Sequence, residues 1–123
     1  MLMPLGMLKL NSQWSVRLSR EAEEDFLKFD SKQQSQIKRA VDKFSLNPLP
    51  KSEGGYGNPL HGELAGYFKI KLINAGIRVL YTLKRRKNRM IVVLIGMRRD
   101  DEVYEIALER LQKFRERRLR RRK

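Results

Sequence analysis

The sequence lacks cysteine altogether and has a single histidine among its 123 residues. Without cysteine, disulfide bonds and thiolate metal sites are excluded, and a metal site would have to rest almost wholly on carboxylates. We therefore predict no metal and no other cofactor. The same lack of cysteine makes the cytoplasm the expected compartment.

Long apolar runs are also missing. The apolar stretch 90–97 is far shorter than the about 18 consecutive apolar residues that a membrane-spanning helix needs. The apolar segment 1–8 has no basic residue before it and no small-residue cleavage site after it, so no secretion signal is predicted. These features predict a soluble protein of about one domain without a membrane partner.

Positive charge is abundant. The chain has 28 Lys and Arg against 14 Asp and Glu, a net charge of +14. Such a charge favours a polyanionic partner, because neutralised phosphates release condensed counterions. Nucleic acid or the ribosome is therefore the expected partner class. The alternative is that a solvated tail explains the basicity, since residues 115–123 hold seven cations and one Glu.

Hydrophobic periodicity divides the first part of the chain into a strand and two helices. Residues 14–18 alternate apolar and polar side chains, as a half-buried strand does. A helix over 20–29 follows, and a second helix begins at the capping residue Asp30 and ends at Asn47-Pro48. Because little more than a cap separates them, the two helices are expected to form a helical hairpin packed on a sheet. The Gly- and Pro-rich stretch 49–62 is predicted to be a loop.

Three strands and a last helix complete the predicted order. The strands are expected over 67–73, 77–84 and 90–97, joined by hairpin turns, and the helix begins at Asp101. The order β-α-α-β-β-β-α predicts an α+β domain, with an antiparallel sheet covered on one face by the helical hairpin. The predicted units are an N-terminal extension (1–13), a folded domain (14–114) and an Arg-rich C-terminal tail (115–123).

Cations from neighbouring strands should meet on the other face of this sheet. Lys69 and Lys71 alternate with apolar residues in one strand, and Arg78 has the same orientation in the next. Adjacent strands lie only ~5 Å apart, so these side chains are expected to be near neighbours. Their mutual repulsion is costly without an anionic ligand, and the pattern therefore predicts an anion site.

Taken in their order along the chain, four short segments, which include these cations, resemble the RelE branch of the RelE/ParE toxin superfamily. The likeness rests on the Lys-x-Lys strand 67–72, on the Arg in 76–81, on Gly96-Met-Arg98 and on Glu102-Val-Tyr104. It spans about residues 14–111. The resemblance implies the RelE fold and the toxin of a toxin–antitoxin pair, held inactive by a cognate antitoxin protein. It also implies an endoribonuclease that needs no metal and cleaves mRNA in the A site of the 30S ribosomal subunit.

The resemblance also implies a reaction and roles for five residues. A ribose 2′-OH attacks its own 3′-phosphate, which leaves a 2′,3′-cyclic phosphate and a free 5′-OH. Lys71 would take the 2′-OH proton, Lys69 and Arg78 would hold the phosphate oxygens, and Arg98 would stabilise or protonate the leaving oxygen. Tyr104 would stack on or orient a base. Elementary chemistry agrees, because the guanidinium fork matches phosphate and cationic neighbours favour the neutral, proton-accepting form of a lysine.

Two more residues are expected to bind substrate. His61 stands in the loop where RelE-like proteins tend to have a basic residue, so we expect it to contact phosphate, and Arg99 adjoins the Arg98 position. Other branches use a histidine or glutamate base near this loop, but Asn58 replaces their acidic residue and argues against that mechanism. Met97 replaces a common lysine, which is expected to weaken phosphate contacts slightly.

Simpler interpretations and a rival function stay open. The strand lysines could be merely solvated, the arginines at 98 and 99 could pair with the aspartates at 100 and 101, and Tyr104 could be ordinary helix packing. The rival function is that of a ParE-like toxin, which has the same fold and inhibits DNA gyrase without cleaving RNA. A third interpretation is a ribosome-associated basic protein that binds through its tail. Whatever the function, the tail 115–123 has one apolar residue, so it is expected to be unpacked and mobile and to add affinity for ribosomal RNA in a salt-dependent and sequence-blind way.

Overall fold

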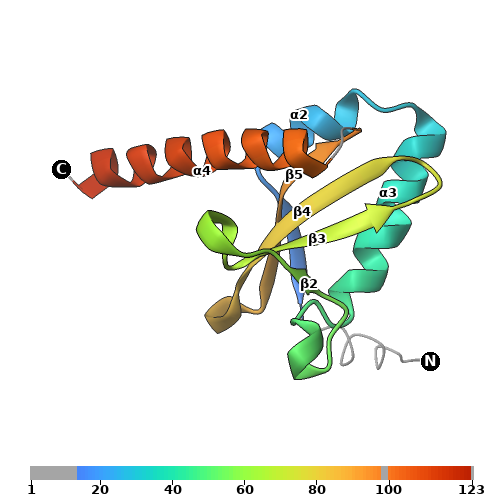
Figure 1. Cartoon of the computed structure of the whole chain (residues 1–123), viewed down its shortest axis with the longest axis horizontal. Helices are drawn as coiled ribbons and strands as arrows, with labels where there is room; N and C mark the ends of the chain where they lie inside the picture. The colour runs from blue at the N-terminus through green and yellow to red at the C-terminus, as the bar shows by residue number, and fades with distance from the viewer. Residues whose placement is uncertain (1–13, 98–99, 123) are drawn as a thin grey trace.

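The computed structural model describes residues 14–97 and 100–122, which form a five-stranded sheet with helices on both faces (Figure 1). The strands lie in the order β1-β5-β4-β3-β2. The elements are β1 (Ser15–Leu18), α2 (Arg20–Leu27), α3 (Ser31–Ser45), β2 (Asn58–Pro59), β3 (Tyr67–Leu72), β4 (Ile77–Lys84), β5 (Arg89–Gly96) and α4 (Asp100–Arg122), with short 3₁₀ turns at Lys51–Glu53, Gly62–Leu64 and Arg85–Lys87.

The predicted helical hairpin is confirmed, and its caps account for its boundaries. The Ser19 side chain accepts a hydrogen bond from the Ala22 amide at 3.1 Å and starts α2. Asp30 and Gln33 form a complete capping box at the start of α3, with bonds of 2.8 and 3.0 Å. Both helices bury their apolar stripes against one face of the sheet.

The sheet is mixed, so the prediction of a wholly antiparallel sheet was wrong at β1. The pairs β2–β3, β3–β4 and β4–β5 are antiparallel, whereas β1 runs parallel to β5 from Ser15↔Arg89 to Leu18↔Val92. Alternation of apolar and polar residues marks a strand but carries no information on the direction of its neighbour. The crossover through α2 and α3 decides that direction here.

Helix α4 covers part of the sheet face opposite α2 and α3, where no covering helix was predicted. Its Val103 and Ala107 pack on Leu80, which stands two positions after Arg78 in β4 and is fully buried. A register shift in the β4–β5 pair helps, because Leu80 pairs with Leu94 whereas its neighbour Tyr81 pairs with Val92. Val93 is therefore an extra residue of β5 relative to β4, as in a β-bulge. Both Val93 and Leu94 contribute to the core under α4.

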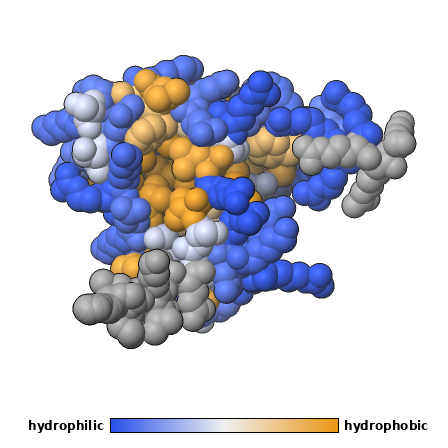
Figure 2. Space-filling model, turned by 180° about the vertical axis from the view of Figure 1, so that it is seen from behind, coloured by the Kyte–Doolittle hydropathy of each residue, from blue (hydrophilic) through white to orange (hydrophobic). Residues whose placement is uncertain are grey.

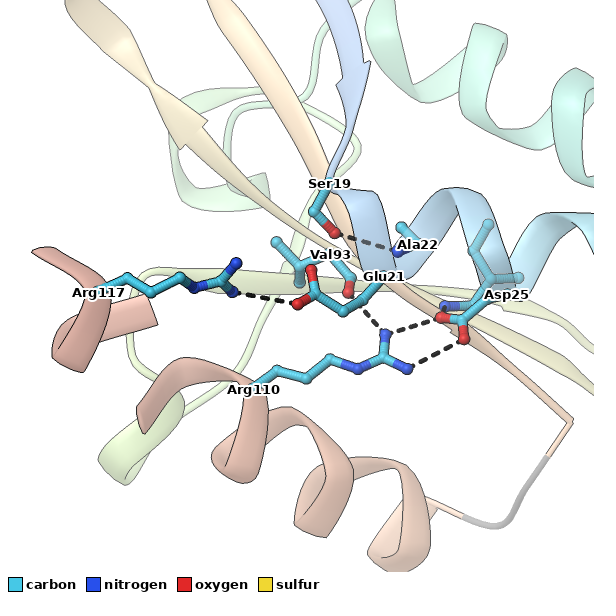
Figure 3. A network of polar contacts seen from close by, with 8 residues as sticks. Ser19, Glu21, Ala22, Asp25, Val93, Arg110 and Arg117 are labelled. Carbon is cyan, nitrogen blue, oxygen red and sulfur yellow. Dashed lines mark hydrogen bonds and ion pairs between the residues drawn. The ribbon is translucent and has the colours of Figure 1, made fainter. Parts of the chain in front are cut away.

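A buried ion pair holds α4 in this place (Figure 3). Arg110 of α4 binds both carboxylate oxygens of Asp25 in α2, at 2.7 and 3.0 Å. The same two side chains reach the backbone of β5 beyond the end of β1, where Arg110 donates to the Val93 carbonyl at 2.9 Å and Asp25 accepts from the Ile95 amide at 3.0 Å. Two helices and one strand edge are thus joined by four hydrogen bonds.

The helix continues through the Arg-rich tail as far as Arg122. At Arg117 the expectation of an unpacked tail was wrong, because this side chain pairs with Glu21 of α2 at 3.1 Å and lies 4.8 Å from the centre of the Phe114 ring. The domain boundary before residue 115 stays a prediction. None of the helices in the described part of the chain combines the length and apolar character needed to cross a bilayer.

An apolar groove of about 210 Å³ opens between β1 and the two helices of the hairpin. Figure 2 shows apolar side chains gathered over the middle of the molecule as seen from behind. The strand at this groove, β1, has only four residues and lies at the edge of the sheet. Its apolar lining comes from Val16, Leu18, Phe26, Ile37, Val41, Val92 and Ile95.

Removing one partner of the buried ion pair should destabilise the fold strongly. Arg110→Met leaves the Asp25 carboxylate buried without its cation, and we expect a loss of about 3 kcal/mol in the free energy of unfolding. The double variant Asp25→Leu/Arg110→Met removes both charges and should recover much of this loss. Urea denaturation followed by circular dichroism measures both values, and equal stability of the single variant and the wild type would contradict the role of the pair.

Candidate functional site

A cleft of about 720 Å³ lies where the loop before β3 meets β3 itself and the first turns of α4. It opens on the face of the sheet opposite α2 and α3. Its lining comes from loop residues that include the single histidine, from two lysines of β3 and from a tyrosine of α4. These residues are Asn58, Pro59, Leu60, His61, Leu64, Lys69, Lys71 and Tyr104.

The loop wall of the cleft is held by the sheet and the core. Asn58 pairs with Lys69 across the β2–β3 ladder, and the Leu60 amide donates to the Tyr67 carbonyl at 2.9 Å. Gly57, just before β2, lies against the core so closely that a Cβ would come within 2.9 Å of the Tyr81 hydroxyl. The loop wall therefore depends on this glycine.

Tyr81 anchors the start of the same loop. Its side chain is fully buried, and its hydroxyl donates to the Pro48 carbonyl at 2.9 Å. Burial raises the pKa of this phenol well above its ordinary value, so Tyr81 keeps its proton and the hydrogen bond at any physiological pH. A neutral, hydrogen-bonded tyrosine thus connects the base of the cleft wall to the core.

Lys71 and Arg78 occupy directly opposed positions in β3 and β4. This confirms the prediction that the cations of the two strands are near neighbours, at the spacing of a cross-strand pair. Lys69, two residues earlier, stands opposite the buried Leu80 and is half-buried, whereas Lys71 is exposed. The sheet therefore presents one shielded and one accessible lysine side by side.

Lys69 is oriented by α4. Its Nζ donates a hydrogen bond to the Tyr104 Oη at 3.0 Å and lies 5.7 Å from the centre of the tyrosine ring. This contact joins residues 35 positions apart in the sequence. It fixes both the lysine and the phenol on one wall of the cleft, so that neither must be ordered when an anion binds.

The groups that line the cleft are suited to an anion. Among the residues that the structure describes, none that lines the cleft has a carboxylate, and no cluster of three or more His, Cys, Asp or Glu suited to a metal ion occurs there. Ammonium, imidazole and phenol groups are what the site offers instead. Such groups stabilise negative charge on phosphoryl oxygens.

The structure brings most of the predicted site residues together. Lys69, Lys71, Tyr104 and His61 line one cleft, with His61 exposed on the loop. Arg78 adjoins them through its pairing with Lys71. The predicted residues 98 and 99 lie outside the described residues, so the roles of Arg98 and Arg99 stay predictions.

Asp25 and Arg110, which help to position the site, were not predicted from the sequence. Asp25 follows Ala22 by three positions on the buried stripe of α2, and Arg110 follows Ala107 by three positions on α4. A charged residue within the buried stripe of a helix indicates an oppositely charged partner, because burying an unpaired charge is costly. This signal was present in both helices, although the sequence does not say that the two charges meet.

Comparison with known proteins gives matches of structure only. No family model matches the sequence, and no curated protein matches it. The isolated RelE toxin of Escherichia coli has a TM-score of 0.59 and 25% identity, over 78% of this chain and 96% of that chain. A mutant of the same toxin in the free state reaches 0.63 at 25% identity, over 77% and 94%. A RelBE toxin–antitoxin complex from Mycobacterium tuberculosis has a TM-score of 0.50 at 26% identity, over 70% and 99%.

Anion binding should depend on the two lysines of the cleft. Lys69→Gln and Lys71→Gln each remove a charged hydrogen-bond donor, and we expect each to weaken the binding of inorganic pyrophosphate about tenfold. The matched control Lys32→Gln removes one exposed charge from α3 and should change binding little. Isothermal titration calorimetry at constant salt compares the three, and equal losses in all of them would show that net charge, not the cleft, binds the anion.

Proposed function

We propose that this chain, a member of the RelE/ParE toxin superfamily, is a ribosome-dependent endoribonuclease that cleaves mRNA in the A site. The observation that carries the proposal is the convergence of Lys69, Lys71 and Tyr104 on one cleft, with Arg78 beside Lys71. The RelE matches, at about a quarter identity, support the assignment.

The cleft residues suit cleavage by the ribose itself. Lys71, exposed at the cleft, accepts the proton of the 2′-OH as its oxygen attacks the adjacent phosphorus. The P–O5′ bond breaks, which leaves a 2′,3′-cyclic phosphate and a 5′-oxygen that takes up a proton. Lys69, held by Tyr104, and Arg78 stabilise the charge on the phosphate oxygens, and Arg98 is assigned to the leaving oxygen by resemblance.

The cations at the cleft favour the nuclease over the ParE-like alternative. A gyrase inhibitor with this fold has no need for two lysines and an arginine on neighbouring strands of one sheet face. Lys71 and Arg78 stand at directly opposed positions of neighbouring strands, and two such cations attract an anionic substrate. The Lys69–Tyr104 contact likewise prepares the cleft for a charged ligand.

Dependence on the ribosome follows from how open the site is. Lys71 and His61 are exposed, whereas electrostatic stabilisation of a transition state is strongest where water is excluded and groups are fixed. The ribosomal A site would cover the cleft and align the 2′-oxygen with the leaving oxygen. The strongly basic surface agrees with docking on ribosomal RNA.

A cognate antitoxin is the second proposed partner. One matched structure is a toxin–antitoxin complex, which supports a partner of that kind for this chain. We expect the antitoxin to cover the cationic face or to displace α4. Val103, Ile106 and Leu111 of α4 belong to the core on this face, so their departure would leave an apolar groove for a segment of the partner.

Lys71→Ala should abolish cleavage without abolishing ribosome binding. The substitution removes the proton acceptor but only one of 28 positive charges. Primer extension on a translated mRNA measures cleavage, and co-sedimentation measures binding. Lys32→Ala, which removes a distant charge, is the control. If Lys71→Ala cleaves mRNA as the wild type does, the role of Lys71 fails. If the wild type cleaves no mRNA and inhibits DNA gyrase, the ParE-like function takes the place of the nuclease.

The isolated protein should cleave naked RNA at most very slowly. Only the ribosome orients the substrate in the open cleft, and such orientation contributes several powers of ten in rate. Parallel time courses on one mRNA, with and without ribosomes, test this. Similar rates in both would contradict ribosome dependence while leaving the nuclease activity in place.

A further inference from the structure

A second pocket, of about 440 Å³, lies between the sheet and the distal half of α4. Two aromatic residues line it, Tyr67 of β3 and Phe114 of α4, above a floor of aliphatic side chains. Three cations border it, Lys84, Arg115 and Arg118. Among its described lining residues none is acidic. The combination of aromatic surface with surrounding positive charge suits an unpaired nucleotide.

The distal turns of α4 that shape this pocket are held in place. The Arg117 guanidinium lies 4.8 Å from the centre of the Phe114 ring and binds Glu21 of α2 at 3.1 Å. These contacts orient the ring before any ligand binds. The cations act on Tyr67 as well: burial raises the pKa of its phenol, and the positive charges of Arg115 and Arg118 oppose that rise.

The pocket continues the surface of the cleft. Tyr67, Lys69 and Lys71 lie at alternate positions of β3, so their side chains share one face at steps of about 7 Å. Lys69 and Lys71 line the cleft, and Tyr67 lines the second pocket. A strand of RNA that passes the two lysines can therefore reach the second pocket without leaving this face of the molecule.

We propose that the second pocket binds an unpaired nucleotide of the same RNA that occupies the cleft. Its base contacts the aromatic rings of Tyr67 and Phe114, and Arg115 and Arg118 bind the adjoining phosphates. This inference rests on the proposed function and adds a subsite to it. It assigns to two arginines of the tail a defined contact, in place of the diffuse, sequence-blind attraction expected from the charge run alone.

Charge-matched variants of one helix separate these two possibilities. Arg115→Gln/Arg118→Gln removes two cations that border the pocket, and Lys113→Gln/Arg120→Gln removes two from the same helix that do not line it. The probe is labelled single-stranded oligouridylate, titrated with the full chain in a fluorescence anisotropy assay at constant salt. We expect the pocket variant to bind about tenfold more weakly and the control variant to lose at most a few-fold.

Phe114→Leu tests the aromatic contribution. It should weaken the binding of the single strand about fivefold or more, because base stacking is lost, and leave binding of the same sequence in a duplex unchanged. The ratio of single-strand to duplex affinity is insensitive to a change in the folded fraction, so partial unfolding cannot imitate the result. An unchanged ratio would overturn the proposal.

Two further outcomes would also overturn it. Equal losses in both charge variants would show a diffuse positive surface, and specific binding of an acidic peptide in place of RNA would show a protein site. The ribosomal cleavage assay stays independent of these results. If Lys71→Ala still abolishes cleavage, only the subsite fails; if the wild type never cleaves mRNA, the proposed function fails.

Discussion

The position of α4 depends on the ion pair between Asp25 and Arg110. Because β1 has only four residues, the edge of β5 beyond it would otherwise expose backbone groups, and the two charged side chains bind them. Arg110 lies six residues after Tyr104 and four before Phe114. Together with the apolar contacts of α4 and the Arg117–Glu21 pair, this ion pair therefore helps to place both the cleft and the second pocket.

The two faces of the sheet differ, which explains how so basic a chain can fold and still present a cluster of cations. The face toward α2 and α3 holds an apolar core that includes the fully buried Tyr81. The opposite face is apolar under α4 and the adjoining loop, and beside that helix it presents Lys69, Lys71 and Arg78. The strand register fixes the backbone positions from which these cations extend.

The two lysines differ in their surroundings, and this difference suits different tasks. Lys69 is half-buried and bound to the Tyr104 hydroxyl, which agrees with a fixed contact to phosphate. Lys71 is exposed and opposite Arg78, which agrees with a group that meets the reacting 2′-oxygen. The roles implied by the resemblance are thus compatible with the geometry of the described residues, although the two arginines at 98 and 99 lie outside them.

The sequence by itself determined the local features. Capping residues set the start of α2 and α3, and the two-residue period with short turns placed Lys71 beside Arg78, because such signals act between residues close along the chain. Only the tertiary structure decided the parallel pairing of β1, the position of α4 on the sheet, the Lys69–Tyr104 contact and the second pocket. Periodicity shows which side of an element is buried but not what buries it, and contacts such as Asp25 with Arg110, 85 positions apart, depend on how distant elements pack.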